Sequence, residues 1–513
     1  MKRLLAALPA LAWLALLPAA AGAADAPPAG IAWHAGDADS AFARAKQESK
    51  PLFLYWGAVW CPYCNQVKAT IFSRQDFIAR SRLFVPVYID GDAPSAQKLG
   101  ARFKVSAYPT MILFRPDGTE VTRLPGEVDG DSYMKVLALG AASGRSVKQL
   151  LAAARAGRAL AADDWRLLAF YSWETDEQAV LARGEMVPTL WQLALASTSA
   201  APEASARLAI KAMSAASRGP ADKAPLDKTA ALQRLRAALA SPPVARANFA
   251  ELAAAAERLP AFLTEPGTPA RGQLLREWDR LLVREAADGN LSRLDRIAAT
   301  DARLALARVD DPKRELPLAL QTEVRAVAHR TVRESTDRYE REAVVGAAAQ
   351  LLSEAGLLDD SDALLKAELK RSATPYYLML GLASNARKRG DSAAALSWYE
   401  QAYAGARGPA TRLQWGASYV RALIDLAPAD EARIERAARS VLGELEPKPE
   451  TFHARNRAVL DRLGGRLADW SKDGSHSAAL TRLREQLAAV CAQLPAQAPE
   501  RAACNDVLAP RAT

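Results

Sequence analysis

The chain has 513 residues, of which 50% are hydrophobic and 24% are charged, and its formal net charge is +9. This composition is typical of a folded globular protein and excludes an intrinsically disordered chain. The length predicts about three domains, or one small domain followed by a long repetitive one. The positive charge does not indicate a nucleic-acid partner, because arginines such as Arg433, Arg436 and Arg439 alternate with Glu and Ala, as on a solvated helix surface.

The N-terminal residues 1–24 have the pattern of a secretory signal peptide. A basic start is followed by an apolar stretch over residues 4–24, and the small residues at 21–23 fit an A-x-A cleavage site. An uncleaved membrane anchor is the alternative, because the stretch approaches spanning length. Pro9 and Pro18 favour cleavage, so we predict a periplasmic or secreted protein with no stable membrane insertion after cleavage.

The residues up to the first motif alternate between strand and helix patterns. Residues 31–34 predict a short strand, and residues 38–50 predict a helix. The apolar and aromatic run at 51–57 predicts a buried strand, and residues 65–80 continue with helical spacing.

Trp60-Cys61-Pro62-Tyr63-Cys64 lies at this passage from strand to helix. Two cysteines separated by two residues can close a disulfide across one helical turn, and such a bridge is exposed enough to be exchanged. The first sulfur lies at a helix N-terminus, where the macrodipole and free backbone N–H groups favour thiolate over thiol. We therefore predict a redox site in which Cys61 is the nucleophile and Cys64 the resolving thiol.

A zinc site and an inert structural bridge are the alternatives for this pair. Four-coordinate zinc needs two further ligands, usually a second CxxC or a pair of histidines. The remaining candidates are isolated in the sequence: Cys491, Cys504, His34, His329, His453 and His476. The redox interpretation is favoured, and no metal and no cofactor are predicted.

Further along, strand patterns at 84–90 and 111–115 are separated by Tyr108-Pro109-Thr110, and a closing helix is expected from about Gly130. With the strand at 52–56 and the Cys61 motif, this order resembles the thioredoxin superfamily, in particular the thioredoxin-like domains of periplasmic disulfide-exchange proteins. The resemblance covers roughly residues 30–145.

The resemblance implies that Pro109 is cis and packs beside the disulfide, and that the backbone of Tyr108 pairs with an extended substrate strand. Trp60, Pro62 and Tyr63 would complete the active-site surface. Two departures matter: the buried aspartate and the lysine that relay protons in typical thioredoxins are replaced by Tyr55 and Pro86. The Pro-Tyr dipeptide between the cysteines also leaves the direction of electron flow open.

After Gly140, Ala-, Leu- and Arg-rich helical periodicity runs to the C-terminus. We therefore predict an α/β thioredoxin-like domain at 25–145, a helical region at 146–340, and a helical region with tetratricopeptide-like repeats at 341–513. The repeats rest on two helix-ending glycines, Gly356 and Gly390, which stand 34 residues apart. An irregular helical bundle is the alternative to stacked helical hairpins.

Cys491 and Cys504 are too far apart for an exchange motif. In an exported protein a structural disulfide that fastens the C-terminal tail is favoured, with a second redox centre as the alternative.

Together these features predict an exported thiol-disulfide oxidoreductase of unknown direction. Its partners would be protein thiols and disulfides and a redox partner that recharges the site. The alternative is a periplasmic interaction scaffold, in which the helical region is the working part and the thioredoxin-like domain a docking module.

Overall fold

The computed structural model describes residues 29–509, except residues 94, 106, 125, 127, 128, 177, 183 and 220–225. The predicted signal peptide lies outside the described residues. Among the helices that are described, none combines the length and the apolar character that a membrane span requires.

The N-terminal domain is built on a four-stranded sheet in the order β2-β1-β3-β4. Strand β1 pairs in parallel with β2 and antiparallel with β3, and β3 pairs antiparallel with β4. The elements are α1 (Ala38–Glu48), β1 (Leu52–Gly57), α2 (Pro62–Val67), the π-helical turn η1 (Lys68–Phe72), α3 (Gln75–Ser81), β2 (Val85–Asp90), α4 (Ala96–Phe103), β3 (Thr110–Phe114), β4 (Glu120–Leu124) and α5 (Gly130–Ala142).

The strand expected at 31–34 is not formed. This segment is irregular, and the His34 N–H donates a hydrogen bond to the carbonyl of Pro86 at 2.8 Å. Two apolar residues were enough to suggest a strand, but the segment is short and does not establish a regular ladder along β2.

The two faces of the sheet have separate cores. Along β1, side chains alternate between the faces, as strand geometry requires. Leu54 and Trp56 pack with α1 and α4 on one face. Phe53 and Tyr55 belong to a second core that continues without interruption into the helical region, where it includes Trp165. The α/β domain and the first helices therefore share one hydrophobic core.

The rest of the chain is helical. The first part contains α6 (Val147–Arg155), α7 (Ala162–Ala169), the 3₁₀ turn η2 (Trp173–Thr175), α8 (Met186–Ala196), α9 (Pro202–Arg218), α10 (Lys228–Ala240), α11 (Pro242–Ala247), α12 (Phe249–Ala255), α13 (Leu259–Leu263), α14 (Pro269–Ala287), α15 (Arg293–Ala307) and α16 (Leu318–Glu334). The second part contains α17 (Arg338–Glu354), α18 (Leu358–Glu368), α19 (Pro375–Lys388), α20 (Ser392–Gly405), α21 (Pro409–Leu426), α22 (Glu431–Gly443), the 3₁₀ turn η4 (Pro449–Phe452), α23 (Ala454–Trp470), α24 (Ser477–Ala492) and α25 (Pro499–Asp506).

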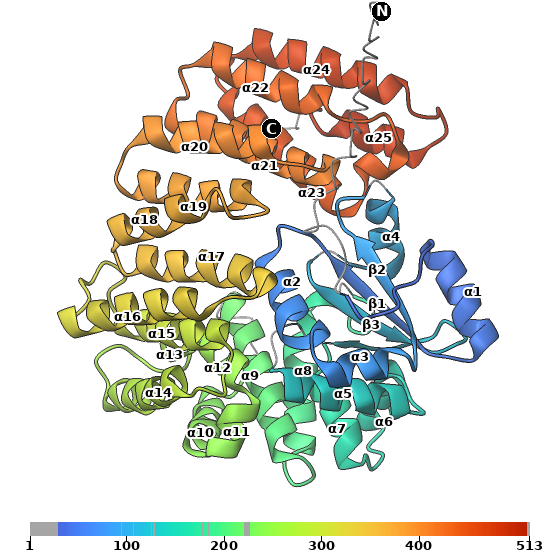
Figure 1. The fold of residues 1–513 in the computed structure, drawn as a ribbon, viewed down its shortest axis with the longest axis vertical. Coiled ribbons are helices and arrows are strands. Elements are labelled where there is room, and N and C mark those ends of the chain that lie inside the picture. The colour runs from blue at the N-terminus through green and yellow to red at the C-terminus, as the bar shows by residue number, and fades with distance from the viewer. Residues whose placement is uncertain are drawn as a thin grey trace, which may run out of the picture.

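These helices form a curved row that begins beneath the sheet and ends above it (Figure 1). The row returns to the α/β domain at two places, because α17 packs against α2 and α23 packs against α4. Helix α2, which follows the two cysteines, therefore lies on the inner side of the curve. Segments more than 270 residues apart in the sequence meet at this helix.

Gly356 and Gly390 each follow a helix, α17 and α19 respectively, and both have positive φ, 80° and 77°. Glycine enters this left-handed region without steric cost, so each residue lets the chain reverse into the next helix. The paired helices α17 with α18 and α19 with α20 pack against each other. The two glycines thus occupy equivalent places in consecutive helical pairs.

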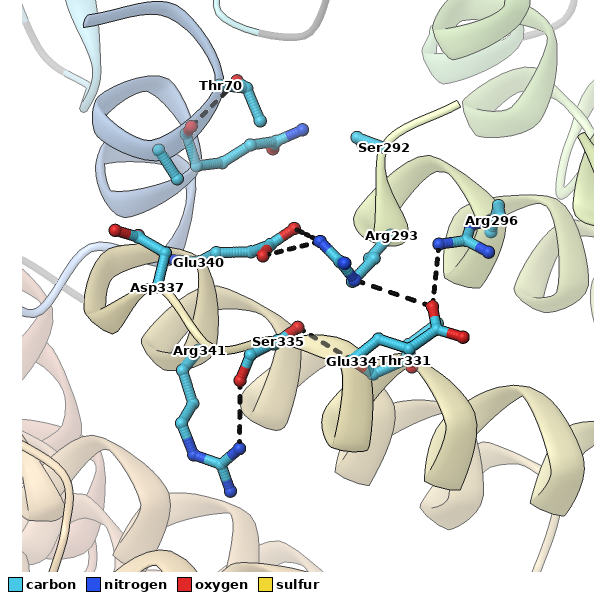
Figure 2. Close-up of polar contacts among 12 residues, drawn as sticks. Thr70, Ser292, Arg293, Arg296, Thr331, Glu334, Ser335, Asp337, Glu340 and Arg341 are labelled. Carbon is cyan, nitrogen blue, oxygen red and sulfur yellow. Dashed lines mark hydrogen bonds and ion pairs between the residues drawn. The ribbon is translucent and has the colours of Figure 1, made fainter. Parts of the chain in front are cut away.

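Ion pairs join neighbouring helices on the inner side of the row (Figure 2). Arg293 of α15 contacts Glu340 of α17 at 2.7 Å and Glu334 of α16 at 3.7 Å. Arg296 also contacts Glu334, at 3.3 Å. The start of α15 is therefore fixed against both α16 and α17.

Candidate functional site

Cys61 and Cys64 form a disulfide at the start of α2, with their Cα atoms 5.2 Å apart. Cys61 is the N-cap residue and Pro62 occupies the first turn. The backbone N–H of Cys64 donates to Sγ of Cys61 at 3.1 Å. Both the helix dipole and this N–H group would stabilise negative charge on Cys61 after reduction, because they place positive partial charge at its sulfur.

The loop before α2 is fixed by side-chain and backbone contacts. The N–H of Cys61 donates to the carbonyl of Ala58 at 3.3 Å, and Asn65 Nδ2 donates to the carbonyl of Val59 at 3.1 Å. At Gly57 a Cβ atom would lie 2.5 Å from the hydroxyl of Tyr55. A glycine at the end of β1 therefore lets the Tyr55 side chain lie against the backbone there.

The peptide bond between Tyr108 and Pro109 is cis, as the thioredoxin resemblance implies. The Tyr108 hydroxyl donates to the carbonyl of Gly91 at 3.2 Å, and the Tyr108 ring meets the Trp60 ring edge-on at 6.0 Å. Two of the predicted site residues are therefore brought together beside the disulfide.

The helical region covers this site. Cys61 is 3% exposed, Cys64 is fully buried and Trp60 is 9% exposed. They share a hydrophobic cluster with Tyr376 of α19 and Trp415 of α21. The Trp415 ring lies 5.0 Å from the Trp60 ring, and its Nε1 donates to the carbonyl of Tyr376 at 3.1 Å. We call Tyr376, Tyr377, Trp415 and Arg455 the aromatic cap.

Arg455 of α23 completes the aromatic cap. Its guanidinium lies 5.0 Å from the centre of the Trp60 ring and 4.6 Å from that of the Tyr108 ring. Such cation–π contacts contribute about 0.5–2 kcal/mol each. The sequence gives no signal for these four residues, because an aromatic residue in an amphipathic helix ordinarily indicates core packing and an arginine there a solvated surface.

Asp92, in the turn that follows β2, links the α/β domain to α21. Its carboxylate accepts a hydrogen bond from the Thr411 hydroxyl. Burial, together with the neighbouring Asp90, raises the pKa of Asp92 to about 6, while Thr411 and Arg455 act in the opposite direction. The Asp92 N–H donates to Asp90 Oδ1 at 3.1 Å, as in a strand-ending turn.

The position of a thioredoxin-type proton relay holds no carboxylate. Tyr55 is fully buried, and its hydroxyl has no hydrogen-bond partner among the described residues. Burial raises the pKa of Tyr55 far above its usual value. Tyr55 therefore cannot exchange a proton with Cys64 near neutral pH.

Tyr63 lies between the two buried cysteines in sequence but is itself 58% exposed. With Pro62 and Gln66 it forms one wall of a cavity of about 610 Å³ between α2 and the helical region. Tyr377 lines the same cavity and also packs against the cluster that contains the cysteines. The Tyr63 side of α2, the helix that begins at the two cysteines, therefore borders this cavity, while the Trp60 side is covered by the aromatic cap.

Cys491 and Cys504 form a second disulfide, between α24 and α25, with Cα atoms 5.7 Å apart. Both are buried in the core cluster of α20–α25, which is distinct from the cluster around Cys61. Across the described part of the chain, His, Cys, Asp and Glu side chains form no group of three or more suited to hold a metal ion.

The family model described as "Thioredoxin-like domain" matches residues 38–141. Residues 38–141 form a thioredoxin-like domain. Two curated relatives of this chain come from Pseudomonas aeruginosa. Thiol:disulfide interchange protein DsbD 2 is 28% identical over 100 residues, covering 19% of this chain and 17% of that protein. Thiol:disulfide interchange protein DsbD 1 is 30% identical over 99 residues, covering 18% and 16%.

The chain thus spans about a sixth of the length of these relatives. Among solved structures, a DsbH oxidoreductase is 21% identical, with 22% of this chain and 86% of that chain covered and a TM-score of 0.20. A thioredoxin from Thermus thermophilus is 26% identical, with 21% and 85% covered and a TM-score of 0.20. All four matches leave most of the helical region without a counterpart.

Proposed function

We propose that this chain is an exported thiol-disulfide oxidoreductase that exchanges disulfides with protein substrates through Cys61 and Cys64. In the reducing direction, the Cys61 thiolate attacks a substrate disulfide and releases one substrate thiol. Cys64 then attacks Cys61 in the mixed disulfide and releases the second thiol, which leaves Cys61 and Cys64 oxidised. A redox partner recharges the site by the reverse sequence.

The observation that carries this proposal is the position of Cys61 as the N-cap of α2, with the Cys64 N–H 3.1 Å from its sulfur. A thiol at such a position has a lowered pKa and is the better nucleophile of a pair. The names of the two curated relatives, both thiol:disulfide interchange proteins, agree with this chemistry.

Alkylation of the reduced protein at mildly acidic pH tests the assignment. Iodoacetamide should label Cys61 well before Cys64, as peptide mass analysis would show. Cys64→Ser should accumulate mixed disulfides with client proteins, whereas Cys61→Ser should not, because only Cys61 makes the first bond. Equal labelling rates at both cysteines would contradict the assigned roles.

We also propose a role for each segment of the chain. The signal at residues 1–24 would direct export to the periplasm, and residues 25–145 would carry the chemistry. Residues 146–340 and 341–513 would serve substrate selection, the latter through tetratricopeptide-like pairs. The matching turns at Gly356 and Gly390 support the repeat assignment.

A second candidate function is an interaction scaffold with little turnover. Burial of Cys61 beneath the aromatic cap favours it, since a covered sulfur exchanges slowly. The reduction of insulin by the full chain distinguishes the two candidates. Steady turnover with a dithiol reductant supports the oxidoreductase. Stable capture of partners by a Cys61→Ser/Cys64→Ser variant, together with negligible turnover by the natural chain, supports the scaffold.

A further inference from the structure

The disulfide can be approached from two sides, and one of them is closed. On the Trp60 side, Trp415, Tyr376 and Arg455 lie against the ring and leave Trp60 9% exposed. An extended substrate strand laid along Tyr108 would collide with these side chains, because Arg455 already lies over the Tyr108 ring at 4.6 Å. A substrate therefore meets the redox helix more easily from the Tyr63 side.

The Tyr63 side opens into the cavity of about 610 Å³ described above. Its far walls come from α12, α15, α17 and α19, and small residues such as Ala254, Ala298, Gly346 and Gly381 leave room between the helices. A volume of this size suits a ligand of a few residues and is too small for a folded domain. The ion pairs of Arg293 hold α15 against α17, so the walls are preformed (Figure 2).

The cavity is apolar with acidic groups and contains no lysine or arginine among its described lining residues. The Asp295 carboxylate accepts a hydrogen bond from the hydroxyl of Ser292, the N-cap residue of α15, at 2.8 Å. Asp301 lines the cavity, and its side chain is solvent-accessible. Nearby Glu354 is paired with Lys388 at 3.1 Å. Asp301 is therefore the carboxylate available to a cationic group entering the cavity.

We propose that this cavity is the substrate-selecting site and that it binds a short, extended segment of a client protein that carries a cysteine, apolar side chains and a lysine or arginine. The apolar side chains would pack against the small-residue walls, and the cation would pair with Asp301. Tyr377 separates the cavity from the sulfurs and moves aside when the client cysteine reaches Cys61. This inference rests on the proposed function and names its substrate class.

Exchange with such a segment proceeds in two steps. The Cys61 thiolate attacks the peptide sulfur of a mixed disulfide, a new S–S bond joins Cys61 to the peptide, and the former partner leaves as a thiol. The Cys64 thiolate then attacks Cys61, and the peptide leaves as a second thiol after protonation by solvent. The two electrons come from the protein, which ends with the Cys61–Cys64 disulfide.

Two synthetic peptides test the charge preference with the reduced full chain. Both contain Ala-Leu-Cys-Ala, one followed by Lys and the other by Glu, and both carry 2-thiopyridine on the cysteine. The absorbance of released 2-thiopyridine gives the second-order rate constant. We expect the Lys peptide to react about tenfold faster than the Glu peptide at low salt, as close charge pairs steer association, and we expect salt to reduce the ratio.

Variants of cavity residues test whether the preference for the Lys peptide arises in the cavity. Asp301→Asn should bring the ratio of the two rate constants close to one. Asp39→Asn is the matched control, since it removes a carboxylate that is 74% exposed on α1, and it should keep the ratio of the natural chain. Gly346→Leu should slow both peptides by filling the cavity, compared with Gly346→Ala, whose Cβ would meet Tyr377 at an ordinary 3.8 Å.

Each result decides the proposal. Equal rates for the Lys and Glu peptides would overturn it, and so would a ratio that survives Asp301→Asn or equal rates for Gly346→Leu and Gly346→Ala. If Asp301→Asn fails to fold, the Gly346 pair still decides. Exchange with 2-hydroxyethyl disulfide by the natural chain tests the proposed function alone. Its absence would contradict oxidoreductase activity, whereas its presence without peptide discrimination would contradict only the cavity site.

Discussion

The two disulfides of this chain are equally buried and differ in what surrounds them. Cys61 is 3% exposed and Cys64 fully buried, while Cys491 is 1% exposed and Cys504 fully buried. The first pair lies at a helix N-terminus, spans three residues and borders a cavity through Tyr63. The second joins two helices across 13 residues within an apolar core. Burial alone therefore does not separate a reactive bridge from a structural one.

The two disulfides differ in the electrostatic environment of the Cys61 sulfur and in which helices bury each pair. The cover over Cys61 comes from α19, α21 and α23, which are distant in sequence, and packing between such units opens more readily than a continuous core. The cover over Cys491 and Cys504 comes from the helices that carry them and their neighbours. Four predictions test this contrast.

The largest expected effect is on chemistry. Cys61→Ser should abolish measurable exchange with any disulfide, because Cys64, the remaining thiol of the pair, is fully buried and does not lie at the N-cap of α2. Cys491→Ser/Cys504→Ser should retain the exchange rate of the natural chain, measured at a temperature where both proteins are folded. A large loss of exchange in the double variant would instead support a second redox centre there, the alternative that the sequence leaves open.

The next largest effect is on stability, where the Cys491–Cys504 disulfide should matter more than the Cys61–Cys64 disulfide. A disulfide closing a loop of this size contributes about 3 kcal/mol in the chain-entropy picture. Cys491→Ser/Cys504→Ser should therefore lower the free energy of unfolding by about that amount in urea titrations. The Cys61–Cys64 disulfide closes a much shorter loop, so breaking it by reduction should cost less stability. Equal losses for the two pairs would show that the second bridge does not fasten the tail.

The local parts of this site could be predicted from the sequence, and the distant parts could not. The strand ending at Gly57 and the N-cap position of Cys61 follow from motif spacing, and the cis bond before Pro109 follows from the family resemblance. The sequence around Trp415 carries no comparable signal. Its position beside Trp60 depends on the packing angles between all of the helices that separate the two residues, which are more than a dozen. The same holds for Thr411 and Arg455, whose partners lie over three hundred residues away.

The third prediction concerns the aromatic cap. Trp415→Phe keeps an aromatic ring but removes the Nε1 hydrogen bond to the carbonyl of Tyr376. A loss of about 1–2 kcal/mol in docking would raise the population of the uncovered state about 5–30-fold. Alkylation of reduced Cys61 should accelerate by a similar factor. Trp470→Phe, which removes the hydrogen bond to the carbonyl of Pro428 far from the site, is the matched control. Equal acceleration in both variants would show general loosening rather than uncovering.

The smallest effect should appear at Asp92, whose pKa of about 6 is raised above the ordinary value of 3.8, mainly by burial. A carboxyl group with a raised pKa in the folded state adds stability below pH 3.8, and that stability is lost as the pH rises through about 6. Asp92→Asn keeps an uncharged oxygen to accept the Thr411 hydrogen bond. The variant should therefore resemble the natural chain near pH 3.5 and exceed its stability at pH 8 by about 1 kcal/mol, since partial solvation screens the effect.

Thermal melts at the two pH values measure this difference, and labelling of reduced Cys61 at pH 8 should slow in the variant as the link to α21 tightens. Asp473→Asn provides the control of opposite sign, because hydrogen bonds from Ser475 lower the pKa of Asp473. That variant should gain no stability at pH 8. If Asp92→Asn and the natural chain melt with the same difference at both pH values, the charge of Asp92 does not weaken the cover over the redox site.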